Sequence, residues 1–426
     1  MSMVVKNNMS AISTLNTLNK NSSALSKSLQ KVSSGMKINS AADDASGYAI
    51  SERMRVQIRS LDQANSNTQN GNSMMKVAEG TVSSTVDILK TLKEKVINAA
   101  NDSNTDDDRI TIQKELDQSI DQINDNANVT FNGKILVDGS KSAKTTVTTT
   151  ALTNQSLSTD TGTTSVASDL ADRNGNKLNI KDTDTITVSY VQQGKTTTKT
   201  FAGTDALDAI LTDVGTLTTG SKIGTSGAGN TVSTASGETA LTLTAKKAGV
   251  DDQIAGMTIS VTDNKGNINK TANASLDAFA ESIRAVNKSS DNSITLQVGT
   301  KANQAIKVGL TDMKATALGL QGTDGSTLNV STREKANAAI NVLDSAISKA
   351  LDQQTTIGSV ESRLEYTSSN LTTASQNVQS SESTIRDADM AKEMTNYTKN
   401  NVLLQAAQSM LSQANQNSSA VLSLLK

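Results

Sequence analysis

The sequence predicts a mainly α-helical protein with a β-rich insert, in which long antiparallel coiled-coil rods arise from both ends of the chain. Two observations predict this class. Apolar residues spaced alternately three and four apart run through both flanks, as helices that wrap around one another require. Most of the 25 glycines lie instead between residues 141 and 330, together with most of the threonines, and this composition favours strands and turns.

Two heptad patterns predict the rods. The N-terminal pattern has one polar member: Met75, Ala78, Val82, Thr85, Leu89, Leu92, Val96 and Ala99. The C-terminal pattern is broken by the polar residues Gln354, Glu361 and Ser368: Ile340, Leu343, Ile347, Ala350, Ile357, Leu364, Leu371, Val378 and Ile385. Because no proline interrupts the C-terminal pattern, we expect it to form one helix of about 50 residues. A capping box from Ser331 to Glu334 is expected to begin this helix.

A shorter helix is expected from about 108 to 125, with Ile112, Leu116, Ile120 and Ile123 on one face. The acidic run at 106–108 precedes it. We interpret this run as complementing the helix dipole, although three carboxylates are also compatible with a cation site.

Strand signals follow this helix. The pair Asn132-Gly133 stands between apolar residues and predicts a β-hairpin, and residues 293–320 contain two more alternating runs. We assign these strands to the helical unit as its β element.

The region 142–292 is expected to form a small α+β outer domain inserted into the helical unit. It contains two weakly similar segments, each with a strand, a polar turn, a polar segment and an amphipathic helix. The first helix is expected at Ala206–Leu211, and the second is expected to carry Leu276, Phe279 and Ile283.

Each chain end carries a row of apolar residues, here called the seam, that could pair with another helix. Few charged residues accompany it. Its predicted members are Ile12, Leu15, Leu25, Leu29 and Val32 near the start, and Leu404, Ala407, Leu411, Ala414, Val421 and Leu425 near the end. Alone, such helices lack a surface large enough to bury them. We therefore expect both ends to be disordered in the monomer and helical only in an assembly.

Together these patterns predict a nested organisation. The two terminal coiled-coil segments pair with each other, the two rod segments form the next unit, and the middle domain is inserted into that unit. The expected boundaries, in chain order, are 1–44, 45–141, 142–292, 293–383 and 384–426.

The composition excludes most enzyme chemistry. The 426 residues contain no histidine, cysteine, tryptophan or proline. The commonest general base, the commonest metal ligand and all thiolate sites are therefore missing, so we expect no catalysis, cofactor or metal ion. A carboxylate-pair hydrolase or a carbohydrate-binding role for the insert remains an alternative.

Charge and hydropathy limit the partners. The net charge of −2 argues against nucleic acid as a partner. No run of about 18 apolar residues occurs, so membrane insertion is not expected. The first residues also lack the apolar run of a secretory signal peptide.

Three segments resemble bacterial flagellins: LQKVSSGMKINSAADDASGYAISERMR at 29–55, TFNGKILVDG at 130–139, and STIRDADMAKEMTNYTKNNVLLQAAQSMLSQANQNSSAVLSLLK at 383–426. The resemblance covers about 1–141 and 293–426. It implies a subunit that polymerises into the extracellular flagellar filament for motility. It further implies export through the flagellar type III channel, a chaperone that binds the C-terminal segment, and association with hook-associated and cap proteins.

The nearest alternative is a hook–filament junction protein, which has related termini, and the VLSLL ending favours a flagellin. Some flagellins carry a metallopeptidase in the middle domain, but that activity needs histidines.

The resemblance also implies a surface for a host innate-immune receptor, formed by two helices. The receptor-active form has arginine in place of Thr91 and leucine in place of Lys95, whereas its glutamate is kept as Glu115. With these two departures, we expect recognition to be weak or absent. The simpler interpretation of Glu94 and Glu115 is solvated helix charge.

Overall fold

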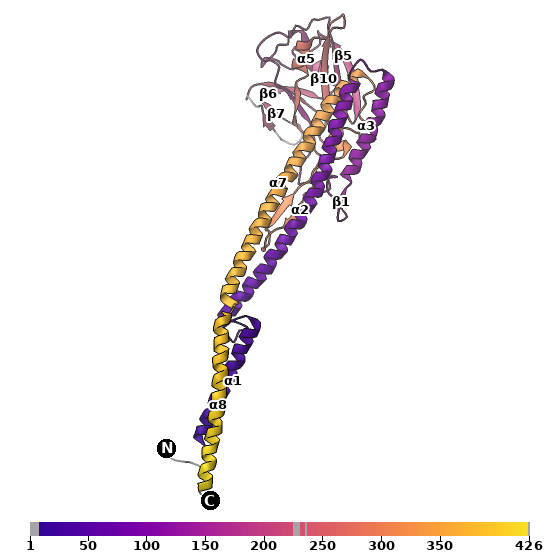
Figure 1. Ribbon diagram of the computed structural model, residues 1–426. Helices are drawn as coiled ribbons and strands as arrows, with labels where there is room; N and C mark the ends of the chain where they lie inside the picture. Colours follow the sequence, from indigo (N-terminus) through magenta and orange to yellow (C-terminus); the bar gives the residue numbers. More distant parts are fainter. Residues whose placement is uncertain (1–7, 225–230, 235–236, 425–426) are drawn as a thin grey trace. The chain divides into compact units, whose positions relative to one another are not determined.

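The computed structural model describes residues 8–224, 231–234 and 237–424 (Figure 1). The chain forms two compact units. We call residues 8–68, 297–304 and 366–424 the terminal unit. The remaining described residues, which lie within 69–296 and 305–365, form the body unit. Two long helices, α2 (Ala45–Ala99) and α7 (Arg333–Arg386), contribute residues to both units.

The terminal unit is built from paired helices. Helix α1 (Met9–Ser34) lies beside α8 (Met390–Leu424), as Figure 1 shows. The side chain of Asn8 caps the start of α1 by accepting a hydrogen bond from the backbone of Ala11 at 3.0 Å. Gly35 ends α1 in the left-handed conformation, with φ of 71°, which glycine adopts without steric cost.

The rods of the body unit bury most of the heptad positions that the sequence predicts. Every predicted position of α2 from Met75 to Ala99 is buried, including the polar Thr85. On α7, Leu343, Ala350, Ile357 and Leu364 are also buried. The other apolar positions of the C-terminal pattern are half-buried: Ile340, Ile347, Leu371, Val378 and Ile385. Helix α7 is 54 residues long, which confirms the expected uninterrupted rod.

Helix α3 (Asp106–Ala127) confirms the capping interpretation of the acidic run. Thr105 and Asp108 form a reciprocal capping box, with the Asp108 carboxylate accepting from the backbone of Thr105 at 2.9 Å. Asp106 accepts from Arg109 at 2.9 Å. The hydrogen bonds from Thr105 lower the pKa of Asp108. The run therefore forms the first turn of α3, where its carboxylates cap the helix and complement its dipole.

The β-hairpin is also confirmed. Strands β1 (Thr130–Phe131) and β2 (Lys134–Ile135) pair across Asn132 and Gly133, whose φ angles are 49° and 73°. Positive φ at both central residues is the geometry of a type I′ turn. The two alternating runs further along form the pair β12 (Ile294–Gln297) and β13 (Ala305–Val308).

The insert contains two main sheets around a common hydrophobic core. One has the order β10-β4-β5 and the other β11-β3-β9-β6; a third pair, β7-β8, is small. The strands are β3 (Ala151–Asn154), β4 (Thr185–Gln192), β5 (Lys195–Ala202), β6 (Thr216–Gly220), β7 (Lys222–Gly224), β8 (Thr231–Ser233), β9 (Ala240–Thr244), β10 (Gly256–Thr262) and β11 (Phe279–Ile283).

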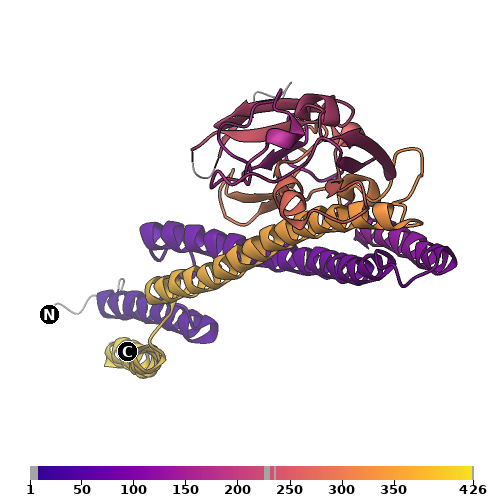
Figure 2. The ribbon, with the colours of Figure 1, turned by 90° about the horizontal axis from the view of Figure 1, so that it is seen from above.

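Short helices complete the body unit: α4 (Leu207–Leu211), α5 (Lys270–Leu276) and α6 (Ala315–Leu318). Figure 2 shows the insert beside the N-terminal half of α7. Strand β10 comes very close to that helix, because a Cβ on Gly256 would lie 2.7 Å from the backbone nitrogen of Val342. Glycine is therefore required at this crossing.

Two local predictions are wrong. The second amphipathic helix ends at Leu276, and Phe279 and Ile283 belong to strand β11, which pairs with β3. Their 3-4 spacing does not distinguish a helix from a helix end followed by a strand. At the start of α7, Thr332 rather than Ser331 provides the cap, by accepting from the backbone of Lys335 at 3.4 Å.

Candidate functional site

The antiparallel pair of α1 and α8 is the candidate site. Three asparagines hold its register: Asn8 donates to the carbonyl of Ala414 at 3.2 Å, Asn21 to that of Leu403 at 3.2 Å, and Asn400 to the Ser28 hydroxyl at 3.0 Å. These side-chain bonds fix which turns of the two helices face each other.

The structure divides the predicted seam residues into three groups. Leu25, Val32, Leu404 and Leu411 are half-buried in the pair, and Ala407 and Ala414 are buried. Ile12, Leu15 and Leu29 are exposed, at 47%, 45% and 52%. Leu425 and the side chain of Val421 lie outside the described residues.

Sequence reasoning missed part of the α1 face that meets α8. The less exposed residues of α1 follow a regular 3-4 spacing: Ala11, Thr14, Leu18, Asn21, Leu25, Ser28 and Val32. Four of them are small or polar, so a search for large apolar side chains passes over them. Their spacing is the signal that could have found them.

Large apolar side chains of this pair remain exposed. On α1 they are Met9, Ile12, Leu15 and Leu29, and on α8 they are Met390, Met394, Val402, Leu403 and Met410. Leu403 and Met410 are seven residues apart and therefore lie on one side of α8. Many large exposed apolar side chains on one helix pair are typical of a site that another molecule covers.

The joint between the terminal helices and the long rods is centred on Arg386. Its guanidinium lies 2.7 Å from a carboxylate oxygen of Glu52 and 5.5 Å from the centre of the Tyr48 ring. Its Nε donates to the sulfur of Met36 at 3.2 Å. Because Arg386 is only 5% exposed, these partners compensate a buried charge. The hydrogen bond from Arg386 lowers the pKa of Glu52.

The backbone of the same joint is also tied together. Lys37 donates to the carbonyl of Arg386 at 2.6 Å, and Ala388 donates to the carbonyl of Gly35 at 2.9 Å. Backbone hydrogen bonds therefore join the segment between α1 and α2 to the segment between α7 and α8.

Two aspartates shape the loop that leads into α2. Asp43 accepts hydrogen bonds from the backbone of Asn39 and Ser40, and the bond from Asn39 is the main cause of its lowered pKa. Asp44 accepts from the backbone of Gly47 at 2.9 Å, as an N-cap does. A Cβ on Gly47 would lie 2.7 Å from Ile38, which is 3% exposed. The motif around 35–50 therefore encodes a capped turn with no room for a side chain.

The residues of the possible receptor surface lie on α2 and α3. Thr91, Glu94 and Glu115 are exposed. Lys95 and Glu115 form an ion pair at 3.0 Å, so the two helices are joined through the side chains of this surface.

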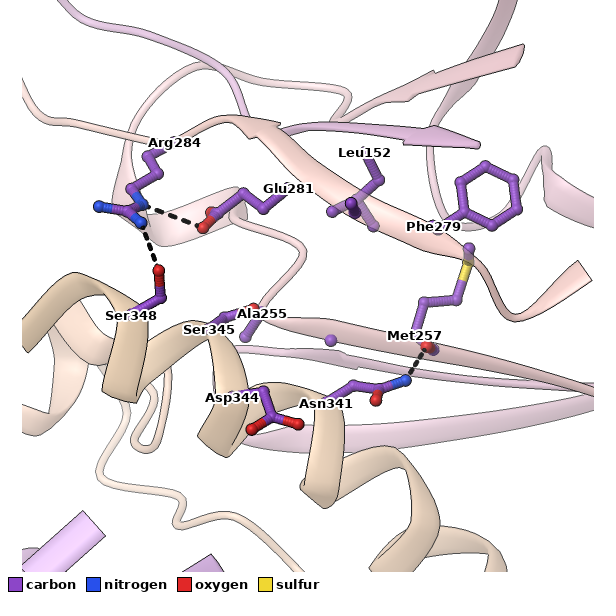
Figure 3. Close-up of a pocket in the computed structure, with 12 residues that line it drawn as sticks. Leu152, Ala255, Met257, Phe279, Glu281, Arg284, Asn341, Asp344, Ser345 and Ser348 are labelled. Atoms are coloured by element: carbon purple, nitrogen blue, oxygen red, sulfur yellow. Dashed lines mark hydrogen bonds and ion pairs between the residues drawn. The ribbon is translucent and has the colours of Figure 1, made fainter. Parts of the chain in front are cut away.

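A small pocket of about 240 Å³ lies where the insert meets α7 (Figure 3). Asn341 of α7 donates to the carbonyl of Met257 at 2.7 Å. Arg284 of the insert contacts Glu281 at 3.2 Å and Ser348 of α7 at 3.0 Å. These bonds fasten the insert to α7, and the buried groups of the pocket partner one another.

Within the described part of the chain, no group of three or more acidic side chains is placed to hold a metal ion. The described helices also include none that is long and apolar enough to cross a membrane. Long rods with paired terminal helices and an uncovered apolar surface are typical of a fibrous structural subunit.

Comparisons with known proteins agree with this class. Residues 5–142 match the bacterial flagellin N-terminal helical region, and residues 340–425 match the bacterial flagellin C-terminal helical region. A flagellin of Clostridium tyrobutyricum is 36% identical over 422 residues, which cover 97% of this chain and 99% of that protein. A flagellin of Bacillus subtilis (strain 168) is 29% identical, with both chains fully covered.

Among solved structures, FliC from Burkholderia pseudomallei matches 69% of this chain and 99% of its own, at 15% identity and a TM-score of 0.28. The flagellar junction protein FlgL from Legionella pneumophila matches 80% of this chain and 100% of its own, at 15% identity and a TM-score of 0.33.

This chain belongs to the bacterial flagellin family. It is a structural subunit of the flagellar filament, and the full-length relatives named flagellin favour this role over that of a junction protein.

Proposed function

We propose that α1 and α8 form the inner contacts of the filament, where other copies of the chain cover the apolar side chains that the single chain leaves exposed. The observation that carries this proposal is the exposure of Met9, Ile12, Leu403 and Met410 beside an already paired seam. Burying an apolar side chain of this size contributes about 1.5–3 kcal/mol. Repeated along a helical polymer, such contacts favour assembly.

The weakness of the α1–α8 pair supports disorder of both ends in the isolated monomer. The described residues that become buried in the pair are small: Ser28, Ala407 and Ala414. Little apolar area is therefore gained against the conformational entropy that the helices lose. The helix break at 35–44 supports a first terminal segment that ends at residue 44, and the break at 387–389 lies three residues after the expected start of the second segment at 384.

Seeded polymerisation tests this role. The full chain should elongate seeds into long filaments, and a chain lacking 384–426 should fail to elongate while residues 45–383 keep their helical circular dichroism. As a point variant, Leu403→Asn should slow elongation. Ile268→Asn is the matched control, because Ile268 is 54% exposed but lies in the insert. Normal elongation of the truncated chain would contradict the proposed role of the termini.

The likeness of the terminal segments to flagellins also supports a route by which the chain reaches the filament. We propose export through the flagellar type III channel, with a chaperone on 384–426 before export and with hook-associated and cap proteins at the ends of the filament. A chain without cysteine cannot cross-link on this route, and a chain without proline has no slow X–Pro isomerisation after it. Secretion in a strain lacking the channel tests this route, since the chain should then remain in the cell.

We further propose that recognition by a host innate-immune receptor is weak. Thr91 and Lys95 replace the arginine and leucine of the receptor-active pattern, and the Lys95 ion pair competes for Glu115. Strong signalling by purified monomer in a receptor reporter cell line would contradict this proposal.

A further inference from the structure

The methionines of this chain are divided sharply by exposure. Among those in the described residues, the exposed ones all lie on α1 or α8: Met9, Met390, Met394 and Met410. Their exposure ranges from 42% to 69%. The buried ones, at 7% or less, all lie in the body unit: Met74, Met75, Met257 and Met313. Met36 and Met54 are half-buried.

We propose that Met9, Met390, Met394 and Met410 are sites of peroxide oxidation in the unassembled chain, and that the resulting sulfoxides block its addition to the filament. The inference rests on the proposed role of the terminal helices in assembly. The pairing of α1 with α8 leaves these four thioethers accessible, and unpairing would expose them further.

The chemistry needs only hydrogen peroxide. A sulfur lone pair attacks one peroxide oxygen, the O–O bond breaks, and a proton moves to the departing oxygen to give water. The sulfur gains one oxygen and loses two electrons, which reduce the peroxide. Susceptibility follows exposure, so the four terminal sulfurs should react before the buried ones. Where the terminal helices are paired, Met36 is a poorer site, because Arg386 donates to its sulfur at 3.2 Å.

The sulfoxide changes the surface that other copies must cover. Met9 and Ile12 are one helical turn apart, and Met410 lies on the same side of α8 as Leu403. A sulfoxide oxygen there is a strong acceptor among apolar side chains, and burying it without a donor opposes assembly. Once a subunit has assembled, the same contacts exclude solvent from the four sulfurs.

The test uses the full-length chain. Monomer is treated with hydrogen peroxide until about half of the exposed methionine is oxidised, and is then mixed with unoxidised seeds. Filaments and free chains are separated by centrifugation, and the sulfoxide fraction at each methionine is measured by peptide mass spectrometry. We expect the four terminal positions to oxidise first and their sulfoxides to be depleted in the filament fraction by about tenfold, the factor for 1.4 kcal/mol.

Two further arms identify the cause. Reduction of the free chains with methionine sulfoxide reductases of both stereospecificities should restore their elongation. A variant with leucine at all four positions should elongate at the same rate with and without the peroxide treatment, so that each preparation is its own reference. Equal oxidation of terminal and buried methionines, or equal sulfoxide content in filaments and free chains, would overturn the inference. Failure of untreated chain to elongate would instead contradict the proposed function.

Discussion

The guanidinium of Arg386, at the last position of α7, lies 2.7 Å from the carboxylate of Glu52 in the second turn of α2. Arg386 is nearly buried, whereas Glu52 is partly exposed. The pair joins the two rods at the point where each gives way to a terminal helix. Tyr48 and Met36 also contact the guanidinium, so removing the arginine affects three neighbouring side chains at once.

We predict that filaments of Arg386→Met dissociate at a lower temperature than wild-type filaments, by a few degrees. The substitution keeps the volume of the side chain but leaves Glu52 without its buried partner. Sedimentation after heating measures the effect. Arg55→Met is the matched control, because Arg55 also contacts Glu52, at 3.4 Å, but is exposed. Equal dissociation temperatures for the two variants would show that the joint does not depend on Arg386.

A second prediction concerns Glu361, a polar position in the C-terminal heptad pattern. One of its carboxylate oxygens is buried without a hydrogen-bond partner. Burial raises its pKa, as does the nearby Glu79 of α2, while Lys76 acts in the opposite direction. The folded state therefore holds this proton more tightly than the unfolded state. The stability it contributes is present below the ordinary pKa of about 4.5 and is lost as pH rises through the raised value.

Glu361→Gln should therefore unfold at a higher temperature than wild type at pH 7, with the difference shrinking as the pH approaches 4. Thermal unfolding of monomer, followed by helical circular dichroism at both pH values, measures this. Glu365→Gln is the control on the same helix, since Glu365 is exposed. A constant difference across the pH range would mean that titration of Glu361 is not its cause.

The capping box of α3 gives a third prediction. Thr105→Ala removes the hydroxyl that accepts from the backbone of Asp108 at 3.3 Å. We expect a loss of about 1 kcal/mol in the free energy of unfolding of the monomer, the usual cost of losing a threonine cap. Urea unfolding measures it. Thr105→Ser keeps the hydroxyl and should lose far less, so equal losses would assign the effect to the methyl group.

The fourth prediction concerns the receptor surface. The double variant Thr91→Arg, Lys95→Leu restores the receptor-active residues and frees Glu115 from its ion pair with Lys95. We expect its signalling in a reporter cell line to exceed that of wild type by at least about tenfold, which corresponds to 1.4 kcal/mol of binding. Lys90→Leu, an exposed substitution on the same helix, should leave signalling unchanged. No gain by the double variant would place the cause elsewhere on the chain.

Local sequence patterns predicted the structure correctly where the stabilising contacts lie within a single helix or turn. The heptads from Met75 to Ala99 are buried as predicted, because a 3-4 spacing of apolar side chains has one stable use in a long helix. Asn132-Gly133 forms its turn because both residues tolerate positive φ. The acidic run caps a helix because its hydrogen bonds are made within a few residues.

Local patterns gave a wrong or incomplete prediction where segments far apart in the chain pack together. Phe279 and Ile283 form a strand because β3, more than a hundred residues earlier in the chain, offers an edge whose backbone they pair with. The α1 face that meets α8 contains Asn21 and Ser28 because their hydrogen bonds to α8 set the register, while Ile12 and Leu15 remain exposed. The helical flanks, the resemblance to flagellins and the lack of histidine and cysteine side chains can all be read from the amino-acid order. Which strand β11 pairs with, and which face of α1 meets α8, depends on contacts between residues far apart in the sequence. The spacing of residues along the chain does not encode those contacts.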